Sequence, residues 1–132
     1  MMSSIPVDVQ EELVAFTQNL IRIKSVSGHE EQIIRFLAQK MQALGYDEVV
    51  LDAMGNLLGR IGHGSRSILF DSHVDTVAVT DEEAWKIPPF SGEIVDGCLY
   101  GRGSVDMKSS VAASIYAGAL AKKMGWDAGK TI

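Results

Sequence analysis

"LFDSHVDTV", residues 69–77, is the stretch that decides the fold. It begins as an apolar run, typical of a β-strand covered on both faces, and then carries Asp71, His73 and Asp75 at alternate positions. Successive side chains of a strand point to opposite faces, so these three side chains are predicted to share one face. We therefore predict that residues 67–77 form the middle strand of a sheet, with a polar cluster at its carboxyl end.

The chain before this strand contains two helical patterns. Apolar residues recur at helical spacing over residues 7–24 and again over residues 31–44. Ser27 and Glu30 have the spacing of a capping box ahead of the second helix, and Gly45 is a stop signal after it. Two amphipathic helices are predicted here.

Short apolar runs separated by turn residues predict two β-hairpins. One spans residues 46–61 around "MGN", and the other spans residues 93–100 around Asp96 and Gly97. Between them, residues 78–92 have no sustained period and contain two prolines, so an irregular loop is expected.

Small residues from Asp106 to about Met124 predict a third helix, which Gly125 ends, and "GKTI" at residues 129–132 reads as the start of a new strand. The predicted class is α/β, with three layers in which a mixed β-sheet is flanked by helices. An apolar edge strand that stops after two residues leads us to expect a truncated chain.

Composition limits the classes of partner. The 132 residues suit one domain, and a net charge of −5 without a basic patch argues against binding nucleic acid or an anionic membrane. No apolar run is long enough for a membrane span, and residues 1–12 lack the pattern of a secretory leader. The single Cys98 cannot form an internal disulfide and is predicted to be a small buried hydrophobe. A cytoplasmic location is expected.

The polar groups of the first stretch suit a metal site. Ligands of open α/β sheets gather at the carboxyl ends of strands, where His73 is predicted to lie. A metal-ligating imidazole usually donates its other N–H to a carboxylate, and Asp75, two residues on and on the same face, could accept it. The alternative is a strand end with hydrated acids facing solvent.

A second motif, "YGRGSVDMKSS" at residues 100–110, places Asp106 after a glycine turn near the start of the third helix. The alternative is a simple N-cap aspartate. Phosphate sites do not fit: the Asp106 carboxylate would repel a pyrophosphate, and Arg102 and Met107 stand where a Walker A loop needs glycine. Together, the two motifs indicate a metal site split between two segments.

The ordered combination of motifs resembles a known family, the co-catalytic zinc peptidases and deacylases, which include acetylornithine deacetylase, succinyl-diaminopimelate desuccinylase, aminoacylase and glutamate carboxypeptidase. Within it, the chain is most similar to the selenium-metabolism-linked hydrolases. The resemblance runs through nearly the whole chain, over "LIRIKSVSGHEE", "GNLLGRIG", "DSHVDTV" and "PPFSGEIVDGCLYGRGSVDMK".

The resemblance implies roles for individual residues. His73 would ligate one metal ion, Asp106 would bridge two ions, and Asp75 would be the catalytic carboxylate that orients His73. The ions would be two divalent cations, zinc with cobalt or manganese as alternatives. Arg102 and Gly103 would shape the loop that holds Asp106.

The resemblance also implies a cis peptide bond between Asp106 and Met107. Ser109 departs from the family pattern, in which glycine is common at that position. The packing at the start of the third helix is therefore expected to differ from that of the family. The three site residues are intact.

The implied reaction is cleavage of an amide bond in a small-molecule amide or peptide substrate, by water activated between ions about 3.5–4 Å apart. The resemblance implies that several parts lie beyond the strand that begins at Thr131. They are the general-base glutamate, the remaining metal ligands and a lid domain that forms the contacts of a homodimer. Residues 1–132 are therefore expected to be the N-terminal part of a metallohydrolase catalytic domain. Alone, they should be inactive and bind metal weakly at best, since too few ligands are present. The competing hypothesis is a binding module that keeps the fold without the chemistry.

Overall fold

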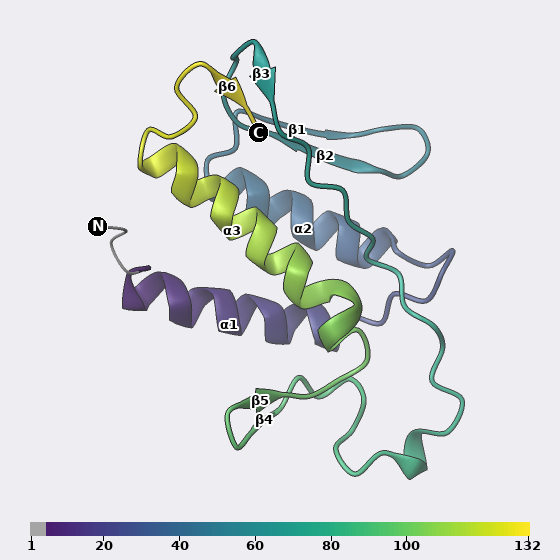
Figure 1. Cartoon of the computed structure of the whole chain (residues 1–132). Coiled ribbons are helices and arrows are strands. Elements are labelled where there is room, and N and C mark those ends of the chain that lie inside the picture. Colours follow the sequence, from purple (N-terminus) through teal and green to yellow (C-terminus); the bar gives the residue numbers. More distant parts are fainter. Residues whose placement is uncertain (1–4) are drawn as a thin grey trace.

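The computed structural model describes residues 5–132. Residues 1–4, part of the stretch in which we expect no leader, lie outside the described residues. Three helices pack together, with short strands above them and a further strand pair below them in the view (Figure 1). They are α1 (Val7–Arg22), α2 (Glu31–Ala43) and α3 (Ser109–Lys123). Their apolar faces form one core of buried side chains, namely Phe16, Leu20, Ile33, Leu37, Val111, Ala112, Ile115 and Tyr116.

The strands form three pairs. The antiparallel pairs are the two predicted hairpins, and the third pair is parallel. The pairs are β1 (Glu48–Leu51) with β2 (Leu57–Arg60), β4 (Ile94–Val95) with β5 (Cys98–Leu99), and β3 (Arg66–Ser67) with β6 (Lys130–Thr131).

The strand β6 lies between β3 and the end of β2. Ile61 and Ile132 exchange two backbone hydrogen bonds of 2.8 Å, and Gly62 forms an antiparallel bridge with Thr131. On its other side, β6 runs parallel to β3. Parallel and antiparallel pairing thus meet at one strand, and the α/β class predicted from the sequence is confirmed.

The predicted middle strand over residues 67–77 is wrong. Residues 68–77 contain no strand. Their backbone bonds to distant segments are scattered: Ile68 N–H donates to Thr131, and an isolated bridge lies at Thr76. Leu69 is 88% exposed and Phe70 is 62% exposed. A strand needs a hydrogen-bonding partner, and the described residues supply none beside residues 69–72.

Two smaller expectations also fail. Cys98 is exposed, not buried, because it lies on β5 of a two-stranded hairpin that packs no second layer over it. The third helix begins at Ser109, after an irregular turn over residues 104–108, instead of at Asp106. Residues 78–92 form the predicted loop, with one short 3-10 turn, η1 (Glu82–Ala84). Within residues 5–132, no helix has the length and apolar character that crossing a membrane requires.

Candidate metal centre

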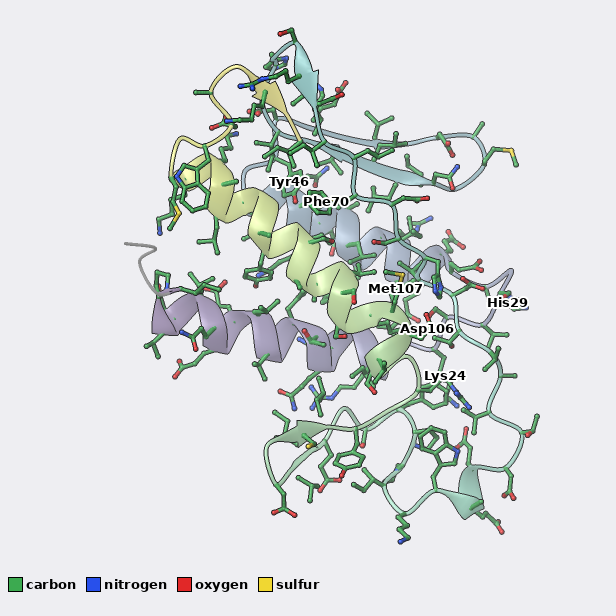
Figure 2. The ribbon with its side chains drawn as sticks, viewed as in Figure 1. Lys24, His29, Tyr46, Phe70, Asp106 and Met107 are labelled. Atoms are coloured by element: carbon green, nitrogen blue, oxygen red, sulfur yellow. The ribbon has the colours of Figure 1, made fainter. Side chains whose placement is uncertain are left out.

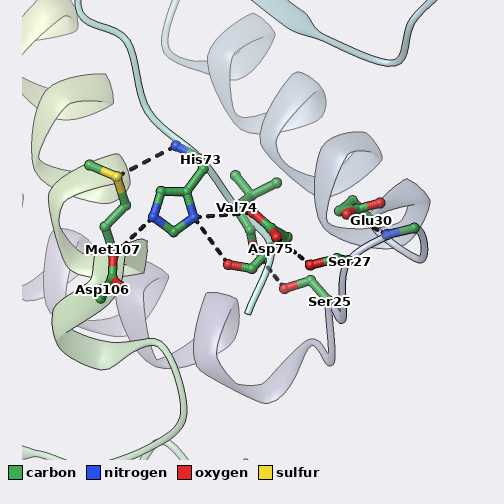
Figure 3. Close-up of polar contacts among 9 residues, drawn as sticks. Ser25, Ser27, Glu30, His73, Val74, Asp75, Asp106 and Met107 are labelled. Carbon is green, nitrogen blue, oxygen red and sulfur yellow. Dashed lines mark hydrogen bonds and ion pairs between the residues drawn. The ribbon is translucent and has the colours of Figure 1, made fainter. Parts of the chain in front are cut away.

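The segment that carries His73 and Asp75 is anchored to the loop between α1 and α2 (Figure 3). Thr76 donates its N–H to the Ser25 carbonyl at 2.8 Å, and the Ser25 hydroxyl donates to the Val74 carbonyl at 2.7 Å. The Val74 side chain packs against the helical core. His73 and Asp75, on either side of it, are half-exposed and face a common polar pocket.

The glycine turn of the second motif packs directly against this segment. Gly103 has a φ of +80°, and a Cβ there would lie 2.7 Å from the Thr76 methyl carbon. Only glycine tolerates both the backbone conformation and the close approach. The Gly103 carbonyl accepts the Lys108 N–H at 2.9 Å, which closes the turn around Asp106.

Lys108 connects the same turn to the end of α1. Its side chain is 0% exposed, and its ammonium donates to the carbonyls of Leu20 at 3.0 Å and Ile23 at 2.7 Å, at the end of α1. Burial lowers the Lys108 pKa to about 8. In the sequence, Lys108 stood out only as a possible part of a phosphate-binding loop. Its position two residues after Asp106 is the one feature of the sequence that points to a structural role.

His73 lies between two carboxylates. Its Nε2 is 2.9 Å from Asp106 Oδ1, and its Nδ1 is 3.2 Å from Asp75 Oδ1. The hydrogen bond with Asp106, followed by the contacts with Asp75, raises the His73 pKa above its usual value. A raised imidazole pKa means that the site favours positive charge at the ring, whether that charge is a proton or a metal ion.

Ser27, which the sequence did not identify as a site residue, extends the row of contacts from Asp106 through His73 to Asp75. The Ser27 hydroxyl donates to Asp75 Oδ2, and this bond, followed by that of His73, lowers the pKa of Asp75. The predicted capping box is therefore wrong: Ser27 caps no helix, and the Glu30 carboxylate accepts the Gly28 N–H. The serine had been visible in the sequence only as a capping signal.

The structure thus brings His73, Asp75 and Asp106 together. Within the described residues Asp71 forms no hydrogen bond or ion pair with them. The N-cap alternative for Asp106 is wrong, because Lys108 is the residue that precedes α3. The peptide bond between Asp106 and Met107 is cis, as the resemblance implied.

Arg102 lies beside the site, and the two other histidines lie at the surface. The Arg102 guanidinium stacks on the Trp85 ring, 5.2 Å from its centroid, and joins the loop after residue 77 to the glycine turn. His29 and His63 are exposed.

The donor set fits a divalent metal ion in type but is incomplete. Imidazole nitrogen and carboxylate oxygen are common zinc ligands, and at bond lengths of about 2.0–2.2 Å two tetrahedral donors lie roughly 3.3–3.5 Å apart. The 2.9 Å between His73 and Asp106 would open to that distance with a small swing of Asp106, which is 84% exposed. Among residues 5–132, no group of three or more His, Cys, Asp or Glu side chains is placed to hold an ion. The described chain therefore offers two donors, where zinc sites use three or four.

Known proteins share both the sequence and the fold of this chain. Residues 69–132 match the model of the peptidase family M20/M25/M40. The uncharacterized protein YgeY of Escherichia coli K12 is 34% identical over 120 residues, 91% of this chain and 30% of the relative. The succinyl-diaminopimelate desuccinylase of Caulobacter sp. K31 is 40% identical over 119 residues, 89% of this chain and 31% of the relative. The chain thus spans about a third of the length of these relatives.

Two solved structures have the same fold. A metallo-carboxypeptidase of the M20 family from Sulfolobus solfataricus superposes with a TM-score of 0.77 at 20% identity, covering 96% of this chain and 29% of that one. Human carnosine dipeptidase 1 superposes with a TM-score of 0.72 at 23% identity, covering 88% of this chain and 29% of that one. The matched residues 69–132 hold both motifs that meet at His73, and over them this chain is similar to the M20/M25/M40 peptidase family.

Proposed function

We propose that the protein is a metal-dependent hydrolase that cleaves an amide bond, as a deacylase of N-acyl amino acids or as a dipeptidase or carboxypeptidase. One observation carries the proposal: His73 Nε2 and Asp106 Oδ1 lie 2.9 Å apart, while the other ring nitrogen faces Asp75. In this proposal His73 and Asp106 are metal ligands, with Asp106 shared between two divalent ions. Zinc is the proposed metal, with cobalt or manganese as alternatives.

The chain's own residues would prepare the site in three ways. Asp75 holds the Nδ1 proton of His73, so that Nε2 presents its lone pair to a metal ion. Ser27 keeps Asp75 ionised by donating a hydrogen bond to it. Lys108 fixes the turn that presents Asp106. Divalent ions in such a site lower the pKa of water and polarise a carbonyl group.

The proposal includes the organisation of the whole protein. Residues 1–132 would be the N-terminal part of a catalytic domain, and further ligands, the general-base glutamate and a lid that forms a homodimer would come from sequence that follows. The two donors described here support this division, since they cannot complete a zinc site by themselves. By itself, the chain would hydrolyse no amide. A cytoplasmic location is proposed on the strength of the single free cysteine.

Metal titration of the chain tests the ligand assignment. Zinc or cobalt is added to the chain and binding is followed by calorimetry and by the NMR signals of the histidine rings. The His73 ring signals should shift, and binding should vanish in His73→Ala. His29→Ala is the matched control, because His29 is exposed and lies outside the site. Equal loss of binding in both variants would refute the assignment.

Activity is tested on the protein that contains the proposed remaining ligands. With zinc, it should hydrolyse members of a panel of N-acyl amino acids and dipeptides, and His73→Ala should abolish the hydrolysis. An intact, metal-loaded protein that cleaves no amide in the panel would favour the binding-module hypothesis instead.

A further inference from the structure

A pocket of about 320 Å³ opens beside the candidate metal centre. His73, Asp75 and Asp106 line it, and so does Arg102 of the glycine turn. Figure 2 shows Asp106 at this end of the molecule, above the loop of residues 78–92 in the view. A ligand that fills the pocket would therefore contact both the centre and Arg102.

The Arg102 guanidinium has no acceptor within the protein. Among residues 5–132 it forms no ion pair and no hydrogen bond. Its Nε is covered by protein atoms without a partner, whereas its two terminal nitrogens are open to solvent. A guanidinium keeps its charge at every pH at which a protein is folded, so both the charge and the donors are left unmatched. Covered polar atoms without a partner are rare in native proteins, and each requires an explanation.

Three other cations that contact the loop or the turn do have partners. Lys24 forms an ion pair with Glu82 at 3.3 Å. Lys108 donates to two backbone carbonyls at the end of α1. Arg22 donates its Nε to a backbone carbonyl of the loop at 3.0 Å. Arg102 differs from all three in lacking an acceptor among residues 5–132.

The Arg102 side chain is nevertheless held in one place. Its guanidinium carbon lies 5.2 Å from the centroid of the Trp85 ring, a cation–π contact, and its backbone N–H donates to the Pro89 carbonyl at 2.7 Å. Stacking uses the flat face of the guanidinium and leaves the N–H groups at its edge free for hydrogen bonds. Because the side chain is oriented before a ligand arrives, the entropy cost of binding is smaller.

A second unpaired donor lies in the wall of the same pocket. Thr76 is 5% exposed, and its hydroxyl has no hydrogen-bond partner among the described residues. The two carboxylates of the pocket do not supply the missing acceptors, because Asp106 and Asp75 face the His73 ring at 2.9 and 3.2 Å. The pocket thus has a surplus of donors and of positive charge at Arg102.

We propose that Arg102 is a specificity-determining residue that holds a carboxylate group of the ligand in this pocket. A carboxylate matches the edge of a guanidinium with two parallel hydrogen bonds and supplies the missing negative charge. The exposed side chains of Val77 and Val105 also line the pocket and suit an apolar part of the same ligand. The inference rests on the proposed function in one respect, since it names the ligand as an amide substrate with a carboxylate near the bond to be cleaved.

A titration of the metal-free chain tests the proposal. N-acetylglycine, which carries a carboxylate, is compared with N-acetylglycinamide, its neutral counterpart, and with sodium chloride at the same ionic strength. The NMR signal of the Arg102 Nε–H group should shift to saturation with N-acetylglycine. The fluorescence of Trp85, in a Trp126→Phe chain that has no other tryptophan, should change over the same range. The neutral amide and the salt should cause neither change.

Substitutions separate the role of Arg102 from the overall charge of the chain. Arg102→Gln should weaken the binding of N-acetylglycine by about tenfold or more, as loss of a charged hydrogen-bond donor does. Arg102→Lys keeps the charge but not the planar fork, and it should weaken binding as well. Arg66→Gln is the matched control, because Arg66 is exposed on β3 and lies outside the pocket.

Three results would overturn the proposal. The first is an Arg102 signal that N-acetylglycine does not shift, and the second is an equal response of the native chain to the acid and to the neutral amide. Neither comparison requires a substitution. The third is equal weakening by Arg102→Gln and Arg66→Gln. Because the titration contains no metal, a failure of zinc to bind at His73 would leave its result unchanged, so this proposal and the proposed function fail separately.

Discussion

His73 and Asp106 are 33 residues apart in sequence, yet their Nε2 and Oδ1 atoms lie 2.9 Å apart, while Nδ1 of the same ring faces Asp75. Each ring nitrogen therefore has its own carboxylate. A neutral imidazole carries one proton, so the nitrogen that keeps it and the nitrogen that binds a metal ion are decided by these two acids. The carboxylates of Asp75 and Asp106 are chemically alike, but their substitutions are predicted to have different effects on metal binding.

Asp75→Asn should weaken zinc binding without abolishing it. The amide keeps the size of the side chain but loses the charge that holds the Nδ1 proton, and loss of such a partner costs about 10–100-fold in metal affinity. Calorimetric zinc titration measures the change. Asp71→Asn is the control, because among the described residues Asp71 forms no hydrogen bond or ion pair with the site residues. Equal weakening by both substitutions would contradict the role given to Asp75.

Local elements could be predicted from the sequence because their determinants are local. The turn between β1 and β2 closes through the Asp52 carboxylate, which accepts the N–H groups of Met54 and Asn56, both at 2.8 Å. The helices follow from apolar periodicity, and the meeting of His73 with Asp106 followed from the family resemblance.

Elements that depend on distant partners could not be predicted in the same way. The apolar pattern of residues 68–72 is that of a strand, but a pattern does not supply the neighbour to which a strand must bond. Ser27 has the spacing of a helix cap, yet its hydroxyl donates a hydrogen bond to Asp75, 48 residues away. Nothing near Lys108 in the sequence reveals that the end of α1 would lie against it.

Lys108→Met should destabilise the fold. Methionine fills much of the same volume, but it leaves the Ile23 carbonyl without its donor and the Leu20 carbonyl with only the longer bond from the Ile23 N–H. A part-buried carbonyl that loses its partner in this way costs about 1–3 kcal/mol. Urea unfolding measures the difference. Lys123→Met, at the exposed end of α3, should change the free energy of unfolding by no more than about 0.5 kcal/mol. Similar losses in both variants would show that Lys108 has no special role.

Gly118→Ala should also destabilise the protein, although alanine is the better helix former. A Cβ at this position would lie 2.6 Å from the Tyr46 hydroxyl oxygen, which donates its proton to the Ile115 carbonyl at 2.9 Å. Displacing the ring should cost about 1–3 kcal/mol, as overpacking does.

The loss of stability in Gly118→Ala should be accompanied by a change in the titration of Tyr46. Burial raises the Tyr46 pKa to about 12, so exposure of the displaced ring should bring it back toward 10, which ultraviolet titration of the phenol detects. Ser110→Ala, at an exposed position of α3, is the control and should cause neither change. A stabilised Gly118→Ala variant would mean that the ring has room to move.

Acid should remove one specific contribution to stability, that of Asp47. Its carboxylate accepts a hydrogen bond from the Lys122 ammonium at 2.6 Å and another from the Gly62 N–H at 2.8 Å, and these bonds lower its pKa below the usual 3.8. A group whose pKa is lower in the folded state stabilises the fold above its unfolded pKa, and that stabilisation disappears as the pH falls through the folded value. The Asp47 contribution should therefore be complete at neutral pH and decline below about pH 4.

Asp47→Asn isolates this effect. The free energy of unfolding of the native chain should exceed that of the variant at pH 7, and the gap should narrow as the pH falls below about 4. Lys122→Gln provides the second arm, because without the ammonium the pKa of Asp47 should move back up. Asp47→Asn should then cost less free energy of unfolding at neutral pH in the Lys122→Gln chain than in the native chain. Urea unfolding at a series of pH values measures all four proteins, the double variant included. A gap that stays constant from neutral to acid pH would mean that Asp47 supports the fold by its size alone, and that its bonds to the end of α3 and to the backbone after β2 carry no charge-dependent stability.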